Sequence, residues 1–463
     1  MKNQVDLVIK NAKVVLENGV IDAVVAVKNE QIVAIADAQM EFDAASVIDA
    51  QGKYLMPGAV DPHAHIWEPT NFPQREDWFT GTQAAAAGGV TTLVEMPLSV
   101  PPVTNTATFA SKNQIISKKS IVDYALWGAL CKHSVGNFEE LHECGCTAYK
   151  GFTPFASPDY PHVEDYDLLQ AMEQIKQFDG LVGIHAENAD IVDKAQKHYS
   201  EHGPFNGATH NIARPEIAEV EAIQRVLLFA KETGVRIHIC HVSTAKAWQM
   251  VERAKQDGVR VTIETCPHYL VLDTDDLDTH GGFAKCNPPL RTPENQTKLW
   301  EMVLDGRIDM IGTDHTPYTD EDRLQHGKDI FKMPPGIGGM DLMVPLMLDE
   351  GVNKRGLSMP RLAKLLATNP AKLMGLYPQK GVIAIGADAD FALVDLEKSW
   401  TYSYQTSYAK AKCENNPYQG KQLKGRVEMT FVRGRCVFDG ENAIDDAGFG
   451  QLIKKGQHQE LSS

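Results

Sequence analysis

One ten-residue stretch of this chain runs Met56-Pro57-Gly58-Ala59-Val60-Asp61-Pro62-His63-Ala64-His65. An apolar, extended run leads here directly into two histidines that are two positions apart. On a β-strand, positions i and i+2 point to the same face of the strand. Two imidazoles on one face at the end of a strand can bind one metal ion from the same side. The stretch therefore predicts a metal site at a strand end.

Similar short apolar runs recur along the chain and alternate with longer helical patterns such as residues 216–232. The runs lie at residues 59–61, 91–96, 121–126, 148–150, 181–185, 237–241, 261–264 and 310–314. Eight strand-then-helix units are typical of an α/β fold, the (β/α)₈ TIM barrel, whose active site lies at the C-terminal ends of the strands. We expect this barrel to occupy residues 58–377.

The two ends of the chain read as short β-strands separated by turns. The clearest runs are at residues 5–9, 23–27, 390–394 and 429–432. Because both ends have the same character, we expect residues 1–57 and 378–463 to form one small β-sandwich domain together.

The composition limits the partners of the chain. Of its 463 residues 43% are hydrophobic and 23% charged, and the net charge is −16. This charge argues against nucleic acid and against an anionic membrane as a partner. We see no signal peptide and no apolar stretch of the roughly 18 residues that a spanning helix needs. The eight cysteines include no Cys-x-x-Cys pair. We expect a cytoplasmic protein with free, mostly buried thiols.

Six polar side chains lie at or just after the ends of the apolar runs. They are His63, His65, Lys150, His185, His241 and Asp314. One buried histidine at a strand end is more often a hydrogen-bonded core residue than a ligand. Six candidates at the strand ends of one barrel favour a metal site instead. Imidazole and carboxylate ligands suit zinc, manganese or iron, and the absence of cysteine disfavours a structural zinc site.

Lys150 and Asp314 have special places in this set. An unpaired lysine charge near cations is costly. Lys150 could pair with a carboxylate, or it could react with carbon dioxide and become a carbamate that bridges two metal ions. Asp314 could accept a proton from metal-bound water, whose pKa a metal lowers to about 7, and pass it to a leaving amide nitrogen. This chemistry is amide hydrolysis.

The remaining polar residues of these regions receive structural interpretations. We expect Asp61 to accept hydrogen bonds, His238 to be structural and His315 to orient a loop. Seven histidines in helix or loop contexts are expected to be solvated: His133, His142, His162, His202, His210, His280 and His326.

The chain resembles the amidohydrolase superfamily and, within it, the cyclic-amide hydrolases, a group that holds allantoinase, hydantoinase, dihydropyrimidinase and dihydroorotase. The resemblance extends over nearly the whole chain. Its most specific stretches are residues 57–65, 88–92, 185–188, 240–243, 264–269 and 386–390.

The resemblance implies two divalent metal ions, usually Zn²⁺, with Mn²⁺, Co²⁺ or Fe²⁺ as alternatives. It assigns one metal to His63, His65 and Asp314 and the other to His185 and His241. A carbamate on Lys150 (N6-carboxylysine), formed with CO₂, would bridge them. It also implies a homo-oligomer, a tetramer or a dimer.

Several stretches bear on the substrate. Dihydroorotases usually have Arg and Asn where this chain has Trp67 and Leu98, and Trp cannot replace an Arg that binds a carboxylate. Residues 287–291, in contrast, do resemble dihydroorotases. Residues 68–69, 95–98 and 284–286 resemble allantoinases, whereas residues 377–381 and 448–451 resemble an L-hydantoinase. Residues 334–336 depart from the Trp-Gly-Gly run of allantoinases. Asn287 and Thr316 are candidates either to hydrogen-bond the ring amide or to cap loops.

We therefore expect a binuclear metal-dependent hydrolase that opens a cyclic ureide. Allantoin is the first candidate and a 5-substituted hydantoin the second, followed by a dihydroorotase-like activity. Two other interpretations stay open: a hydrolase of acyclic amides, and a non-catalytic scaffold. The scaffold is disfavoured because all six ligand positions are filled.

Overall fold

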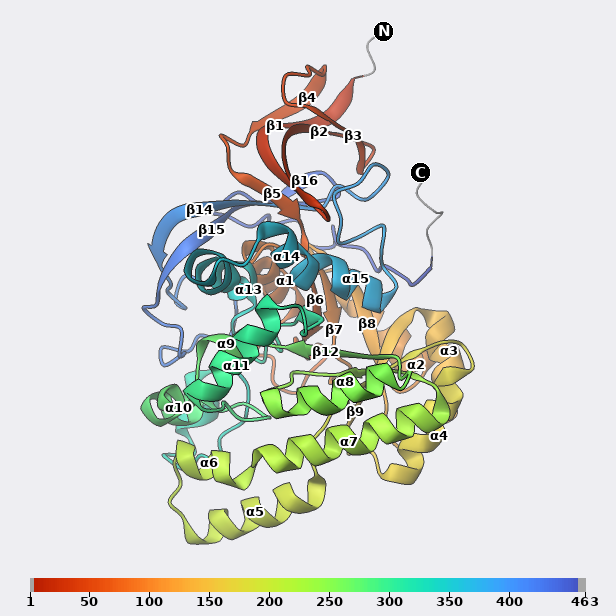
Figure 1. Cartoon of the computed structure of the whole chain (residues 1–463), viewed down its shortest axis with the longest axis vertical. Helices are drawn as coiled ribbons and strands as arrows, with labels where there is room; N and C mark the ends of the chain where they lie inside the picture. The colour runs from red at the N-terminus through yellow and green to blue at the C-terminus, as the bar shows by residue number, and fades with distance from the viewer. Residues whose placement is uncertain (1–3, 457–463) are drawn as a thin grey trace.

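The eight apolar runs form eight parallel strands, each paired with the next along the chain. The computed structural model describes residues 4–456 and is drawn in Figure 1. The barrel strands are β6 (Ala59–Ala64), β7 (Val90–Glu95), β8 (Asp123–Ala129), β9 (Cys146–Phe152), β10 (Leu181–His185), β11 (Arg236–Ile239), β12 (Val261–Thr265) and β13 (Met310–Ile311). A parallel bridge between Ala64 and His315 joins the first strand to the segment after the last. The predicted TIM barrel is confirmed.

Helices connect the strands and cover the outside of the barrel (Figure 1). Their bounds are α1 (Trp78–Ala87), α2 (Thr106–Ile116), α3 (Phe138–Cys144), α4 (Asp165–Lys176), α5 (Ala189–His202), α6 (Gly207–Ala213), α7 (Glu216–Thr233), α8 (Trp248–Gln256), α9 (Pro267–Val271), α10 (Thr274–His280), α11 (Pro293–Leu304), α12 (Asp320–Leu324), α13 (Met343–Met347), α14 (Met359–Ala363) and α15 (Asn369–Met374). The longest, α7, matches the predicted helix at 216–232. It ends at Thr233 and is capped by Gly234, whose φ of 71° is readily adopted by glycine.

A second, mixed sheet is built from both ends of the chain, as predicted. Its strands are β1 (Val5–Leu16), β2 (Gly19–Lys28), β3 (Gln31–Asp37), β4 (Ala44–Asp49), β5 (Tyr54–Pro57), β14 (Phe391–Thr401), β15 (Gln422–Val432) and β16 (Arg435–Phe438). The two ends meet at β5, which pairs with β1 on one side and with β14 on the other.

Alternate residues of this sheet are buried on opposite faces. Val25 and Val27 belong to one apolar cluster, whereas Val24 and Ala26 belong to another. This is the period of two expected of a strand covered on both sides. Strand β5 ends at Pro57 and β6 begins at Ala59. The domain limits at 57/58 and 377/378 stay a prediction.

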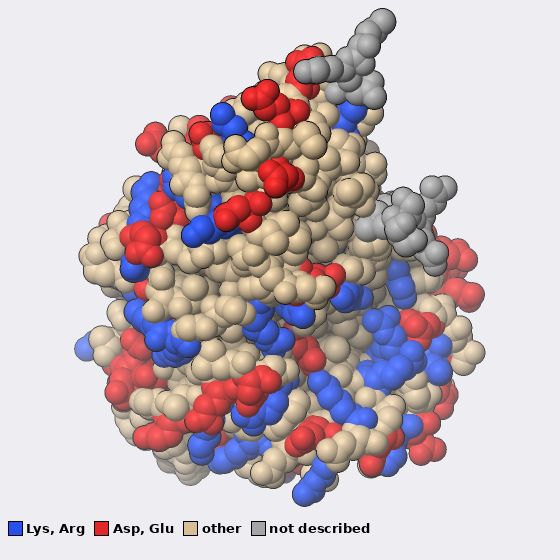
Figure 2. Space-filling model, turned by 45° about the horizontal axis from the view of Figure 1, so that its top comes forward, with Lys and Arg blue, Asp and Glu red and all other residues tan. Residues whose placement is uncertain are grey.

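Within residues 4–456, no helix is long and apolar enough to cross a membrane. The same residues include all eight cysteines, and each of them is free. On the face drawn in Figure 2, acidic and basic side chains are intermixed.

Candidate metal centre

The six predicted ligands meet at the C-terminal end of the barrel strands. His63 lies in β6, Lys150 in β9, and His185 is the last residue of β10. His65, His241 and Asp314 follow β6, β11 and β13 within three residues. All six are buried. The barrel thus gathers residues that are widely separated in the sequence.

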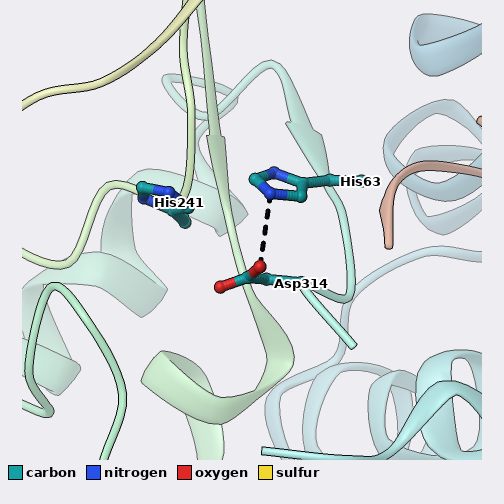
Figure 3. Close-up of side chains that lie close together, drawn as sticks. All are labelled: His63, His241 and Asp314. Atoms are coloured by element: carbon teal, nitrogen blue, oxygen red, sulfur yellow. Dashed lines mark ion pairs between the residues drawn. The ribbon is translucent and has the colours of Figure 1, made fainter. Parts of the chain in front are cut away.

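Three of the ligand atoms lie close enough to share one ion. Nitrogen and oxygen atoms of His63, His241 and Asp314 lie within 4.8 Å of one another, and Figure 3 shows these side chains around one space. Asp314 Oδ1 is 3.2 Å from His63 Nε2 and 3.1 Å from His65 Nε2. The ring centroids of His185 and His241 are 4.5 Å apart. The arrangement is a compact set of nitrogen and oxygen donors.

Two of these residues have an unusual backbone. His241 has a φ of 36° and Asp314 a φ of 46°, a region that costs residues other than glycine about 1–3 kcal/mol. Both residues are held there by hydrogen bonds. The Asp314 amide donates to the His63 carbonyl at 2.8 Å, and the His241 amide donates to Glu264 Oε1 at 3.1 Å. Strain of this kind is characteristic of functional sites.

Lys150 has no partner for its charge among the described residues. Its side chain is fully buried, and its Nζ makes no hydrogen bond. The centroid of the Phe152 ring lies 5.0 Å from this nitrogen. A buried, unpaired ammonium is costly. Because no carboxylate of the described residues bonds to Lys150 Nζ, the arrangement does not favour the alternative in which Lys150 pairs with a carboxylate.

Glu264 is a site residue to which the sequence patterns assigned no role. It lies in β12 and is buried. Its carboxylate makes a short hydrogen bond with His63 Nδ1 and lies 3.3 Å from His238 Nε2. Burial alone would raise the pKa of Glu264, but His63 and His238 hold that pKa below its usual value. An ionised carboxylate here fixes the His63 ring and leaves Nε2 toward Asp314.

A second buried carboxylate, Glu187, holds His185 in the same way. Its Oε2 is 2.7 Å from His185 Nε2 and 2.6 Å from Arg214 Nη2. The Arg214 carbonyl accepts a hydrogen bond from Arg291 Nη1 at 2.8 Å, and Arg291 pairs with Glu219 at 3.0 Å. His185 is therefore anchored by two buried ion pairs that one backbone hydrogen bond links. Only the strand-end position of Glu187, two residues after His185, could have indicated this role.

The protonation of the histidines suits metal binding. Burial lowers the pKa of His65 to about 4, and burial together with Lys150 lowers the pKa of His241 well below 6.5. Neutral imidazole is the form that binds a metal. His63 differs: burial would lower its pKa, yet Glu264 and Asp314 raise it well above 6.5. A metal cation could take the place of that proton. The donor set therefore fits metal ions.

Three neighbouring residues test the structural interpretations. Asp61 accepts hydrogen bonds from the amides of Thr313 and His63. His315 Nδ1 accepts from the amides of Gly339 and Met340 and so orients that loop. The prediction that His210 is solvated is wrong. It is fully buried, because α6 packs against α10, and its Nε2 is 3.1 Å from the Cys286 carbonyl oxygen.

A cavity of about 240 Å³ opens over the ligand cluster. Its polar lining includes both candidate substrate contacts. Asn287 Oδ1 is buried and has no hydrogen-bond partner among the described residues. The Thr316 hydroxyl donates to the Asp314 carbonyl at 2.6 Å, which is the loop-capping geometry. Most of the wall is apolar, and it includes Trp67, Leu98, Phe152, Phe155, Tyr318 and Pro335. The cavity suits a small ring compound rather than a macromolecule.

Comparisons with known proteins identify the family and the fold. The model of the amidohydrolase family matches residues 54–437. An allantoinase of Escherichia coli (strain K12) is 39% identical over 458 residues, which cover 98% of this chain and 99% of that protein. The solved L-hydantoinase (dihydropyrimidinase) from Arthrobacter aurescens superposes with a TM-score of 0.94 at 33% identity and covers 97% of this chain and 100% of its own. The dihydropyrimidinase from Brevibacillus agri NCHU1002 gives 0.89 at 31% identity, with 98% and 99% covered.

Proposed function

The chain belongs to the amidohydrolase family, and from that premise we propose that it hydrolyses the ring amide of a cyclic ureide with the help of two metal ions. The observation that carries the proposal is the cluster of six buried donors under a cavity of small-molecule size. Full-length similarity to allantoinase and to hydantoinase structures supports it.

We assign the ligands as follows. His63, His65 and Asp314 would hold one ion, and His185 and His241 the other. The amine of Lys150 would combine with CO₂, lose a proton and become a carbamate that bridges both ions. The unpartnered, buried Lys150 Nζ supports this assignment, since the carbamate is an anion among neutral imidazoles. Bound ions, Zn²⁺ first, with Mn²⁺, Co²⁺ or Fe²⁺ as alternatives, would polarise the ring carbonyl and make water acidic at neutral pH.

Asp314 is the proton carrier in this proposal. Its carboxylate takes a proton from the attacking water and gives it to the ring nitrogen as the carbon–nitrogen bond breaks. Its position beside His63 and His65 and at the cavity wall supports the role. The unpartnered Asn287 Oδ1 could accept a hydrogen bond from a ring N–H. The product is the open-chain N-carbamoyl acid.

Allantoin is the leading substrate, because allantoinases resemble this chain over their full length. A 5-substituted hydantoin is second, supported by the apolar wall and by the hydantoinase structures. Trp67 and Leu98 line the cavity where a dihydroorotase would carry Arg and Asn, so dihydroorotate ranks below both. We also propose a cytoplasmic homo-oligomer, a dimer or a tetramer, on the family resemblance alone.

The test is a ring-opening assay with zinc or manganese and bicarbonate supplied. The panel contains allantoin, hydantoin, L- and D-5-substituted hydantoins, dihydrouracil and dihydroorotate. We expect the highest kcat/KM with allantoin. A preference for a substituted hydantoin would replace the first candidate by the second. Hydrolysis only of open-chain N-carbamoyl compounds, or protein that binds no metal, would refute the proposal in favour of the acyclic-amide hydrolase or the scaffold.

A further inference from the structure

One residue in the wall of the same cavity, Arg75, has a positively charged side chain that has no role so far. Arg75 belongs to the segment between β6 and α1 and lines the cavity together with Trp67 and Tyr318. Its side chain is 17% exposed. Neither the ligand assignment nor the proton transfer uses this residue. Desolvating a cation on a mostly apolar wall is costly unless it finds partners, so the contacts of Arg75 decide what this side chain can still bind.

The guanidinium of Arg75 is rigidly placed. Its central carbon lies 3.9 Å from the ring centroid of Phe72 and 4.7 Å from that of Tyr318. Its Nε and Nη2 donate to one carboxylate oxygen, Asp322 Oδ1, at 3.1 and 2.9 Å. Asp322 is itself fixed at the start of α12, where its other oxygen accepts from the Thr319 amide at 3.0 Å. Stacking and paired hydrogen bonds therefore pre-organise the cation.

One end of this guanidinium has no acceptor. Arginine has five N–H donors, and within residues 4–456 the hydrogen bonds of Arg75 leave Nη1 without a partner. The other arginine of the cavity wall, Arg214, is different. Its Nε and Nη2 donate to Glu187, and its Nη1 donates to Gln196 at 3.4 Å. Among the two arginines of the cavity wall, Arg75 is thus the one with a nitrogen, Nη1, that donates to no acceptor in residues 4–456.

Arg75 lies near Trp67, which in turn lies near the candidate metal ligand His65. The ring of Trp67 lies 6.3 Å from the His65 ring and 5.2 Å from the Tyr318 ring, and the Arg75 guanidinium lies 5.8 Å from Trp67. A substrate whose ring amide is beside His65 shares one cavity with Arg75, and its ring substituent must occupy the remaining space.

We propose that Arg75 is a specificity-determining residue that donates a hydrogen bond to an acceptor oxygen, carbonyl or carboxylate, on the substituent of the substrate ring. The inference rests on the proposed function and deepens it. The apolar wall alone would favour aromatic or aliphatic substituents. Arg75 shifts the preference toward substituents that end in an acceptor, such as a ureido group or a carboxymethyl group.

The test compares wild-type holoenzyme with Arg75→Met on three substrates: allantoin, hydantoin-5-acetate and 5-benzylhydantoin. The first ends in a neutral carbonyl, the second in a carboxylate and the third in an apolar ring. A hydrogen bond to a charged group is worth roughly 10- to 100-fold. We expect kcat/KM to fall by about that factor for the first two substrates, with the larger loss for the carboxylate, and to change by less than about twofold for 5-benzylhydantoin.

Arg75→Lys separates charge from geometry. Lysine keeps the charge but not the planar fork, so we expect partial recovery with hydantoin-5-acetate and little with allantoin. Equal losses on all three substrates would mean that Arg75 only shapes the wall, and unchanged values would mean that it contacts no substituent. Either result would overturn the proposal.

Binding measured without turnover separates this proposal from the proposed function. Zinc-loaded Asp314→Asn and Asp314→Asn/Arg75→Met proteins are titrated calorimetrically with the same three compounds. If the wild type opens no ring, the proposed function fails. A selective loss of affinity for the two acceptor-bearing compounds would still support Arg75, whereas equal affinities would reject it.

Discussion

Two of the four candidate metal-binding histidines, His63 and His185, depend on a carboxylate that fixes the ring. Glu264 holds His63 and also receives the amide of His241, and Glu187 holds His185. A ring fixed at one nitrogen presents the other in a defined direction, which reduces the conformational freedom lost on metal binding. Residues of this kind are expected to affect metal affinity although they bind no metal themselves.

Replacing Glu264 by Gln tests this effect. The amide keeps the size and one acceptor oxygen but removes the charge, so we expect a loss of about 10- to 100-fold in zinc affinity or activity. Zinc affinity is measured by competition with a chromogenic chelator. Glu252→Gln on the exposed face of α8 is the matched control. Unchanged affinity in Glu264→Gln would show that the carboxylate only supports the barrel.

Lys150→Ala tests the bridging carbamate. We expect loss of bound metal and of activity, with partial recovery when a short carboxylic acid is added, because its carboxylate can stand in for the carbamate. Metal content is measured by elemental analysis of the purified protein. Lys176→Ala, an exposed lysine at the end of α4, should behave as wild type. Full metal content in Lys150→Ala would exclude the bridging role.

At the scale of elements, two segments after the strand ends form one wall of the cavity. Lys285 Nζ donates to the carbonyls of Ile330 and Met333 at 2.7 and 2.6 Å, and the Gly336 amide donates back to the Lys285 carbonyl at 2.8 Å. Gly336 has a φ of 149°, and a Cβ there would lie 2.4 Å from the Thr316 Cβ. Only glycine fits this contact between the wall and the residue after His315.

Lys285→Met removes the hydrogen bonds between the two segments, and we expect the resulting loss of stability to depend on pH. Burial lowers the pKa of Lys285 to about 7, so between about pH 7 and the usual value near 10.5 the unfolded chain binds more protons than the folded one. Stability from this residue therefore rises with pH in that window, by at most about 1.4 kcal/mol per pH unit. We expect the Tm deficit of Lys285→Met to be larger at pH 9 than at pH 6.

Lys328→Met, exposed in the same segment, is the control and should show no such trend. Thermal unfolding at both pH values, with KM for the preferred substrate at each, is the measurement. A deficit that shrinks as the pH rises would contradict the assignment of the lowered pKa to Lys285.

At the scale of the whole molecule, a buried charge cluster joins the terminal sheet to the barrel. Lys380 Nζ lies 2.5 Å from Asp123 at the start of β8 and 2.8 Å from Asp390 just before β14. Arg433, which follows β15, also pairs with Asp123. Asp123 is at the opposite end of its strand from the metal centre. The cluster therefore supports the assembly of the chain rather than its chemistry.

Lys380→Met should lower the free energy of unfolding by about 3–5 kcal/mol, because removal of one partner leaves buried carboxylates unpaired. Metal content per folded molecule should not change. Lys372→Met is the matched control: its pair with Glu17 also joins the two parts of the molecule but is exposed, and exposed pairs contribute about 0–1 kcal/mol. Equal losses of Tm in the two variants would show that the buried pairs of Lys380 stabilise the fold no more than the exposed pair of Lys372.

The barrel, the shared terminal sheet and the six candidate ligands could all be predicted from local patterns. Apolar runs, helical spacing and the His63–His65 pair are properties of neighbouring residues, and strand ends in a barrel converge whatever the loops contain. This is why eight strands were identified correctly, even though β13 has only two residues.

The supporting residues could not be predicted in this way. Glu264 is 201 positions from His63, Asp322 is 247 from Arg75, and Lys380 is 257 from Asp123. In the sequence, a carboxylate at a strand end has the same pattern whether it fixes a metal ligand or faces water. The wrong prediction for His210 has the same cause, since the sequence does not show which segment covers a helical histidine. Which charges are buried together depends on how distant segments pack, and only the folded chain decides that.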